Sequence, residues 1–184
     1  MIVINFRQLR INMERFTRAI EKSIKSENWY AALTLALTIP DICGRLSNPE
    51  LAKESKKRYV KWFDEYVLHH YESPFHGEGF TFMSGEDCYA LRCALLHEGR
   101  DDITSQKARR EVLSKITFST TGSHRCHIEG VLILNLQAFC SEICQAVKSW
   151  NEDCKDSSDI QDAIKELLTI HTQGFSPSFG VFIE

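Results

Sequence analysis

The sequence predicts a mainly α-helical protein, and three features of its apolar pattern carry this prediction. In residues 12–26 apolar residues recur at every fourth position with charged residues between them, as in a helix that buries one face. Residues 29–39 (WYAALTLALTI) are apolar on nearly every side, which is typical of a central buried helix. Residues 131–150 form a long apolar stretch with the same helical spacing. We therefore expect a helical bundle.

The starts and ends of two helices follow from local signals. We expect Pro40 or Gly44 to end or kink the buried helix, because proline lacks the amide hydrogen that a helix interior needs. Residues 48–50 (NPE) place proline where a first helical turn tolerates it, and they predict a helix that runs to about His70. Residues 73–83, with two glycines and a proline, predict an ordered loop.

A further helix is expected between Ser84 and Gly99. Ser84 is followed by the acids Glu86 and Asp87, and a serine cap with acids in the first turn suits the positive end of the helix dipole. Gly99 stands where a glycine commonly ends a helix.

A β-hairpin is predicted between the helices, at about residues 111–128. Residues 111–119 alternate and are rich in β-branched side chains, residues 120–123 (TTGS) suit a turn, and the chain can return as a second strand. After the helix of residues 131–150 we expect a short C-terminal helix and an irregular or extended tail, at about residues 157–184. Residues 1–184 are expected to form one domain, since no linker-like stretch divides them.

Composition and charge limit the classes of function. The chain has 184 residues, a net charge of −3 and seven cysteines without a C-x-x-C pair. This balance argues against a general nucleic-acid coat. Residues 1–61 have twelve Lys or Arg against six Asp or Glu, which permits a local phosphate-binding surface or simply solvated helix faces. Without a signal-peptide core or a long apolar run, we expect a cytoplasmic protein with reduced thiols and no membrane segment.

Arg92 is the residue that stands out. It lies in the middle of residues 88–96 (CYALRCALL), an otherwise apolar or weakly polar stretch that we expect to be buried. No acid stands three or four residues away, where it would lie on the same helix face. A buried unpaired charge is costly. We therefore expect Arg92 to meet a carboxylate such as Asp64 or Glu142, to reach water, or to face a ligand anion.

His97 follows Arg92 by five residues, near the helix end. In an ideal α-helix the two would lie about 140° apart around the axis and about 7.5 Å apart along it, so they would not share a face. We expect an unwound last turn before Gly99, or a groove between two subunits, to bring them together. The negative end of the helix dipole favours an imidazolium there; the alternative is a histidine that merely caps carbonyls.

Arg92 and His97 together resemble the R-x4-6-H motif of the HEPN superfamily, here in the form R-x4-H. The resemblance implies a HEPN-like helical bundle with metal-independent, cofactor-free RNA cleavage, in toxin or antiviral-defence settings. It implies a homodimer in which two motifs meet across a two-fold axis, with RNA and an antitoxin or defence protein as further partners. His97 would assist attack by a ribose 2′-OH or protonate the leaving 5′ oxygen, and Arg92 would stabilise charge on the phosphoryl oxygens.

Four neighbours are candidates for supporting this pair: Glu86, Asp87, Cys93 and Glu98. The family often has a polar residue directly after the arginine, and Cys93 stands in that place. This departure favours a second hypothesis, a catalytically inactive HEPN-like module that binds RNA, a nucleotide or a protein partner. A helical interaction protein unrelated to the HEPN superfamily is the third.

Residues for two other kinds of site are also present. His124 and His127, with Cys140 and Cys144 downstream, supply enough ligands for zinc. The paired spacings of a zinc site are missing, and the two cysteines fit an apolar stripe, so no metal is expected. A nucleophile pair of Cys93 and the histidine four residues later has suitable spacing, but nothing indicates an activated thiol.

Overall fold

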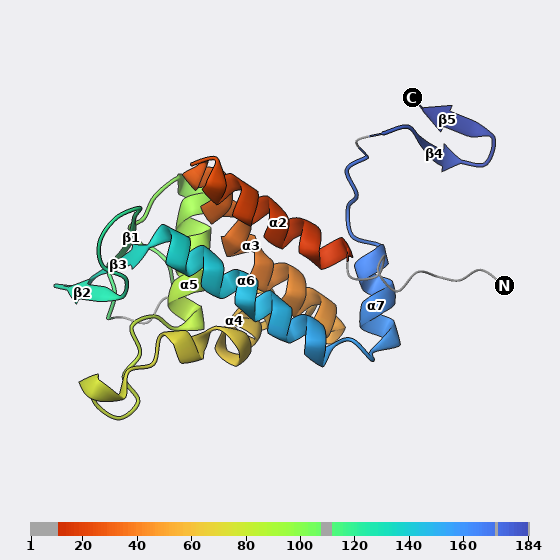
Figure 1. Ribbon diagram of the computed structural model, residues 1–184. Helices are drawn as coiled ribbons and strands as arrows, with labels where there is room; N and C mark the ends of the chain where they lie inside the picture. The colour runs from red at the N-terminus through yellow and green to blue at the C-terminus, as the bar shows by residue number, and fades with distance from the viewer. Residues whose placement is uncertain (1–10, 108–111, 172, 184) are drawn as a thin grey trace.

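The computed structural model describes residues 11–107, 112–171 and 173–183. Its α-helices are α2 (Ile11–Lys25), α3 (Trp29–Ser47), α4 (Ser55–Tyr66), α5 (Gly85–Cys93), α6 (Leu136–Asp153) and α7 (Ser158–Lys165). The protein is mainly α-helical, as predicted. Helices α2, α3 and α6 lie side by side, and α4 and α5 pack against α3 (Figure 1). None of the described helices is long and apolar enough to cross a membrane.

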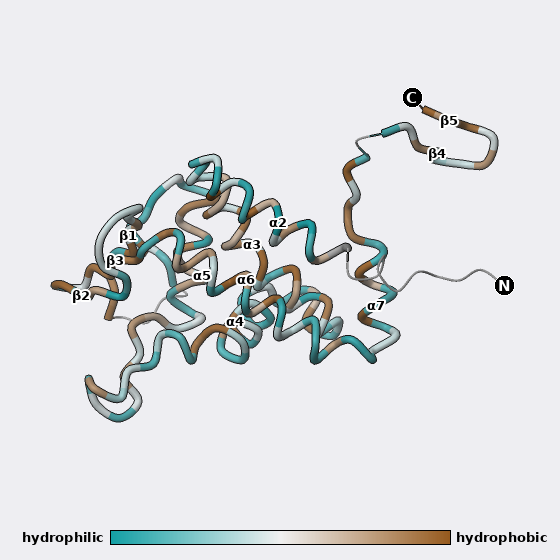
Figure 2. The backbone as a smooth tube through the Cα atoms, in the orientation of Figure 1, coloured by the Kyte–Doolittle hydropathy of each residue, from teal (hydrophilic) through white to brown (hydrophobic). Residues whose placement is uncertain are grey.

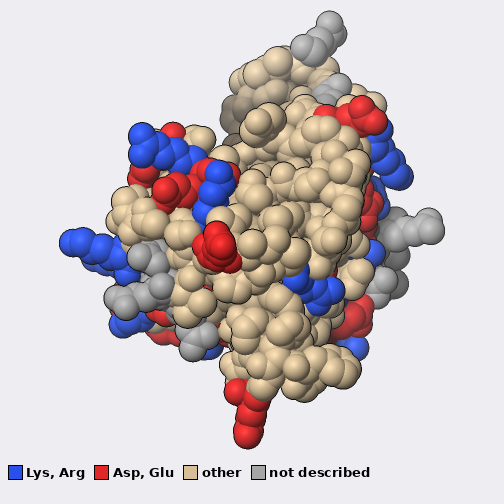
Figure 3. Space-filling view, turned by 90° about the vertical axis from the view of Figure 1, so that its left-hand side faces the viewer, with Lys and Arg blue, Asp and Glu red and all other residues tan. Residues whose placement is uncertain are grey.

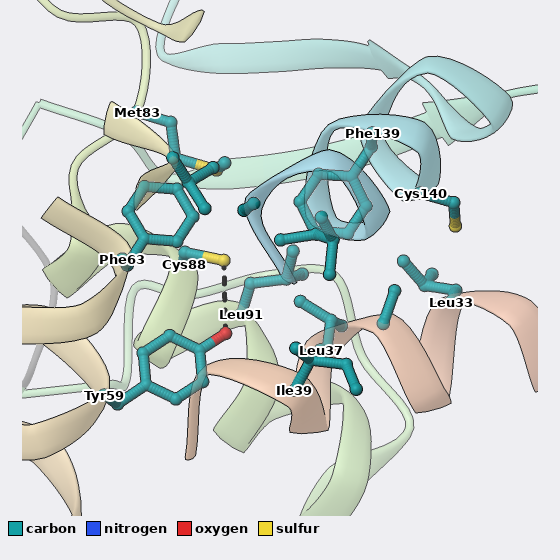
Figure 4. Close-up of a cluster of buried hydrophobic side chains, with 14 of the residues drawn as sticks. Leu33, Leu37, Ile39, Tyr59, Phe63, Met83, Cys88, Leu91, Phe139 and Cys140 are labelled. Carbon is teal, nitrogen blue, oxygen red and sulfur yellow. Dashed lines mark hydrogen bonds between the residues drawn. The ribbon is translucent and has the colours of Figure 1, made fainter. Parts of the chain in front are cut away.

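The core lies between these helices, with α3 at its centre. Figure 2 shows α3 as largely hydrophobic and α2, which covers it, as largely hydrophilic. Side chains of α3, α5 and α6 meet in one cluster that includes Leu37, Leu91 and Phe139 (Figure 4). The largest fully buried side chains are those of Trp62, Trp150, Tyr59, Tyr71 and Phe63.

Pro40 and Gly44 lie inside α3, so neither of them ends this helix. The helix continues to Ser47, and both residues are buried within it. Helix α3 contacts α2, α4 and α6. Packing on these neighbours outweighs the one hydrogen bond that proline removes, because tertiary contacts supply most of a helix's stability.

The helix predicted for residues 48–70 is divided into three pieces. A 3-10 turn at Pro49–Leu51 comes first, α4 begins only at Ser55, and a second 3-10 turn follows at Leu68–His70. Pro49 therefore does start a helical turn, but this turn ends at Leu51. The loop expected at residues 73–83 is present, with one 3-10 turn at Pro74–His76.

Helix α5 begins as predicted, and the π-helical turn that follows it ends at the predicted glycine. The Asp87 N–H donates to Ser84 Oγ, and the Asp87 carboxylate in turn accepts the Ser84 N–H at 3.0 Å, so the two form a capping box. After α5 the chain makes one π-helical turn, Ala94–Glu98, which stops at Gly99 with a φ of 67°. Glycine adopts this left-handed conformation at little cost.

The β-hairpin predicted at residues 111–128 is wrong in its pairing. Strand β1 (Lys115–Ser119) does not pair with β2 (Cys126–Ile128). Both pair instead with β3 (Val131–Asn135), β1 in parallel and β2 antiparallel. The tight turn lies at Glu129 and Gly130, both with positive φ, which suits a two-residue hairpin loop. Residue 111 lies outside the described residues.

Residues 131–135, predicted as the start of a long helix, form the central strand of this sheet. Helix α6 begins at Leu136, where the Asn135 side chain accepts a hydrogen bond from the Ala138 N–H. The run VLIL is apolar and contains two β-branched residues, and such short runs suit a strand as well as a helix. The cap at Asn135 sets the boundary.

The C-terminal part contains the expected short helix, α7, and a tail with its own structure. Strands β4 (Phe175–Ser178) and β5 (Val181–Ile183) form an antiparallel hairpin. Figure 1 shows this hairpin standing away from the helices, beyond α7.

Candidate functional site

Helices α3, α4 and α5 come close together around Arg92. Gly44 of α3 faces the backbone carbonyl of Arg58 on α4, and a Cβ at Gly44 would collide with it. Gly85, at the start of α5, lies against Val60 of α4, whose Cα would be 3.1 Å from an added Cβ. The missing side chains let the backbones approach and bring charged groups of three helices together.

Arg92 has a carboxylate partner on another helix, as its burial required, but the partner is Asp41 of α3. Arg92 Nη2 lies 3.7 Å from Asp41 Oδ2, and Arg58 Nε lies 2.7 Å from Asp41 Oδ1. The two acids suggested by the sequence have other contacts. Asp64 accepts a hydrogen bond from a backbone N–H at the start of α5, and Glu142 belongs to a separate cluster.

The π-helical turn places His97 beside Arg92. The Gly99 N–H reaches the carbonyl of Ala94, five residues back, as well as that of Leu95. A turn widened in this way brings residues five apart closer together around the axis than they are in an α-helix. Arg92 Nη1 consequently lies 3.4 Å from His97 Nε2. The adjusted last turn that the sequence required is therefore found within one chain.

The direction of this contact follows from the chemistry of arginine. Arginine can only donate hydrogen bonds, so His97 Nε2 is the acceptor when it bonds Arg92 Nη1. The imidazole is exposed. Arg92 Nε, by contrast, is buried and has no hydrogen-bond partner among the described residues. A buried donor without an acceptor costs free energy, so the guanidinium has unused capacity to bind an anion.

Aromatic side chains form one wall of the site. The Tyr89 ring centre lies 6.0 Å from the guanidinium carbon of Arg92, and its hydroxyl lies 2.9 Å from Ser55 Oγ. Beneath it, Tyr59 is fully buried with its hydroxyl 3.3 Å from Cys88 Sγ (Figure 4). Burial raises the pKa of Tyr59 well above its ordinary value, so this hydroxyl stays neutral.

The four residues expected to support the pair have other contacts. Glu86 forms an ion pair with Lys56 at 2.7 Å. Glu98 accepts a hydrogen bond from the side-chain amide of Gln106 at 2.8 Å. Asp87 belongs to the helix cap, and Cys93 is a half-buried free thiol. A supporting role for them stays a prediction from their neighbourhood in the sequence.

A second polar cluster surrounds Glu142 of α6, which the sequence did not single out as a site. Its carboxylate lies 2.8 Å from the Tyr71 hydroxyl, 3.0 Å from His124 Nε2 and 3.7 Å from Arg125 Nη2. The Asn135 N–H donates to His124 Nδ1 at 3.1 Å, so the hydrogen of a neutral His124 is on Nε2 and is given to Glu142.

This second cluster joins the sheet to the helices. Arg125 adopts a φ of 62° and donates to the backbone carbonyl of His70, which orients its side chain toward α6. Tyr71 and Glu142 are buried and hydrogen-bonded to one another, and Glu142 also accepts from His124, which fits a structural role better than a reactive one.

The ligands considered for zinc do not gather at one point. Within the described ranges, no group of three or more His, Cys, Asp or Glu side chains is arranged to hold a metal ion. Cys140 and Cys144 pack in and beside the core, where burial raises the pKa of Cys140 to about 12 and that of Cys144 to about 11. Both are therefore protonated thiols near neutral pH.

The surface on the side of the β-sheet carries charges of both signs. Figure 3 shows Lys and Arg next to Asp and Glu there, around a broad uncharged area. This mixture agrees with the overall charge of −3.

Comparison with known proteins adds no relationship to these findings. No model of a known protein family matches the chain, and none of the curated proteins or solved structures compared with it matches. The geometry of the site therefore carries the functional argument.

Proposed function

We propose that this protein is a metal-independent endoribonuclease with a HEPN-like bundle, acting in a toxin or defence setting, and that Arg92 and His97 are its catalytic residues. One observation carries the proposal: an exposed imidazole lies 3.4 Å from a guanidinium whose buried Nε lacks a hydrogen-bond partner among the described residues. An anion binder beside a proton acceptor is the pair that phosphodiester cleavage by an adjacent hydroxyl requires.

The reaction follows from the protonation of this pair. A phosphodiester binds Arg92, which then releases His97 Nε2. The free Nε2 takes the proton of the ribose 2′-OH as its oxygen attacks phosphorus, and the bond from phosphorus to the 5′ oxygen breaks. A proton returns to the leaving oxygen, so the products are a 2′,3′-cyclic phosphate and a 5′-hydroxyl. Arg92 stabilises the charge on the phosphoryl oxygens at the transition state.

A homodimer fits this chemistry. One histidine cannot both accept and donate the proton in a single concerted step, whereas two copies of His97 facing one groove can divide the tasks. His97 is exposed, so it is accessible to a second subunit.

RNA cleavage by purified protein in the presence of EDTA tests the proposal. We expect His97→Ala and Arg92→Ala to lower the cleavage rate by about 100-fold or more, which is the usual contribution of a general acid–base group or a charge-stabilising donor. His127→Ala and Arg18→Ala are matched controls, because both side chains are exposed and lie on other elements.

The products and the substrate provide a second check. Cleavage should leave 2′,3′-cyclic phosphate ends and stop when the attacking 2′-OH is methylated. Intact RNA after incubation with the dimeric protein, or equal cleavage by His97→Ala, would refute the proposed activity.

An inactive module that binds RNA, a nucleotide or a protein partner is the second candidate. Cys93, where the family often has a polar residue, favours it. In that case RNA stays intact, and salt-sensitive RNA binding is lost in Arg92→Ala but kept in Arg18→Ala.

A further inference from the structure

The contacts of Arg92 with α3 indicate how this side chain is positioned for the proposed function, and the inference about Asp41 rests on that function. We infer that Asp41, held by Arg58, is the residue that positions Arg92, and that the phosphate of an RNA linkage must replace Asp41 as the partner of Arg92. Asp41 itself does not touch the reacting atoms, so it is a positioning residue.

The two oxygens of Asp41 have different neighbours. Oδ1 accepts a hydrogen bond from Arg58 Nε at 2.7 Å, whereas Oδ2 lies 3.7 Å from Arg92 Nη2, beyond hydrogen-bond distance. Arg58 is fixed in turn, because its Nη1 donates to the carbonyls of Leu51 at 3.2 Å and Ala52 at 2.6 Å. Arg58 thus holds Oδ1 of Asp41, and Oδ2 faces Arg92.

A long contact of this kind guides Arg92 without fixing it. The side chains of Asp41 and Arg92 are only 19% and 20% exposed, so their attraction is less screened than that of a surface pair. A phosphate oxygen at hydrogen-bond distance would compete successfully with a carboxylate oxygen at 3.7 Å. Without RNA, the contact with Asp41 therefore orients the guanidinium of Arg92. When RNA binds, its phosphate replaces this contact.

The charge of the cluster indicates which anion completes it. Two guanidinium groups and one carboxylate leave one positive charge uncompensated. A phosphodiester linkage carries one negative charge, so an internal RNA linkage balances the cluster without a metal ion. A terminal phosphate monoester, with up to two negative charges, would overcompensate while His97 is neutral.

Asp41→Asn separates positioning from plain structural support. Asparagine keeps the shape and an oxygen for Arg58 but removes the charge that aims Arg92. We expect kcat for RNA cleavage to fall about 10- to 100-fold, while an uncleavable RNA with a methylated 2′-OH binds about 3- to 10-fold more tightly, because a competing anion is gone. Loss of structural support would instead weaken binding and stability together.

A third readout does not depend on activity. Hydrogen exchange of the Arg92 Nε–H, followed by NMR, should accelerate in Asp41→Asn, while that of the Arg18 Nε–H stays the same. Glu14→Gln is the matched control, because it removes the carboxylate from an exposed arginine pair at 2.7 Å and should alter none of the three readouts. Asp41→Ser, which also removes the charge, replaces Asp41→Asn if the latter does not fold.

The outcomes distinguish this inference from the proposed activity. If the wild-type protein does not cut RNA, the nuclease proposal fails, whereas tighter RNA binding and faster Arg92 exchange in Asp41→Asn would still support Asp41 as the positioning residue. A folded Asp41→Asn protein with unchanged RNA binding and unchanged exchange at Arg92 overturns the inference.

Discussion

At the scale of single residues, a lone charge in an apolar helix proves informative. Arg92 stands out in this way. Asp41 is the only acid in α3, but Arg45 follows it by four residues in the same helix, so the sequence pattern offers Asp41 a nearer partner than Arg92. The pairing of Asp41 with Arg92 therefore could not be read from the sequence before the fold was known.

Glu142 allows a prediction on pH and stability. Burial raises the pKa of Glu142, but hydrogen bonds from His124 and Tyr71 and the charge of Arg125 outweigh burial, so the pKa lies below its ordinary value. A carboxyl whose pKa is lowered on folding stabilises the protein above its unfolded pKa of about 4.3 and loses this contribution as the pH falls through the folded value.

Glu142→Gln should therefore lower the free energy of unfolding at pH 7 by about 1 to 3 kcal/mol, since the amide cannot accept from all its neighbours. The difference from the wild type should shrink below about pH 4. Urea unfolding across this pH range measures it. Glu152→Gln, at an exposed pair with Lys155, serves as the control, and an equal loss at pH 3 and pH 7 would contradict the assignment.

At the scale of elements, two local devices build the site. The π-helical turn converts a five-residue spacing into a contact between Arg92 and His97, and Gly44 brings α4 close enough to α3 for Arg58 to hold Asp41. The first was anticipated as an adjusted last turn. The second depends on which helix packs against Gly44, and this cannot be read from α3 alone.

Gly44→Ala tests the close approach of α3 and α4, because it shows whether the free energy of unfolding rises or falls. Alanine normally stabilises a helix interior by about 1 kcal/mol relative to glycine. Here the added Cβ would meet the Arg58 carbonyl, so we expect destabilisation of about 1 to 3 kcal/mol. Thermal or urea unfolding decides between the two signs. A stabilised Gly44→Ala protein would show that the close approach of α3 and α4 is not required.

At the scale of the whole molecule, the C-terminal hairpin differs from the helical core in how far its apolar side chains are exposed. The hairpin of β4 and β5 exposes large apolar side chains, with Phe179 fully exposed and Phe182 67% exposed. Helix α7, in contrast, buries Ile164, and the segment directly after it accepts hydrogen bonds from Arg15 of α2 at Leu167 and Thr169.

Removal of residues 174–184 should consequently leave the unfolding free energy within about 0.5 kcal/mol of the full chain, and it should reduce self-association at high concentration. Removal of α7 as well should destabilise the bundle by about 2 kcal/mol or more, because Ile164 leaves the core. Chemical unfolding and light scattering measure both. A marked loss of stability in the shorter truncation would show that the hairpin packs on the bundle.

The sequence by itself determined what depends on neighbouring residues: the helical class, the cap at Ser84, the stop at Gly99 and the need of Arg92 for an outside partner. Each is a local matter of hydrogen bonding, backbone conformation or charge. Only the tertiary structure decided the continuation of α3 through Pro40, the pairing of β3 with both β1 and β2, and the choice of Asp41. These depend on contacts between distant segments, where packing outweighs a local preference, and no single segment carries that information.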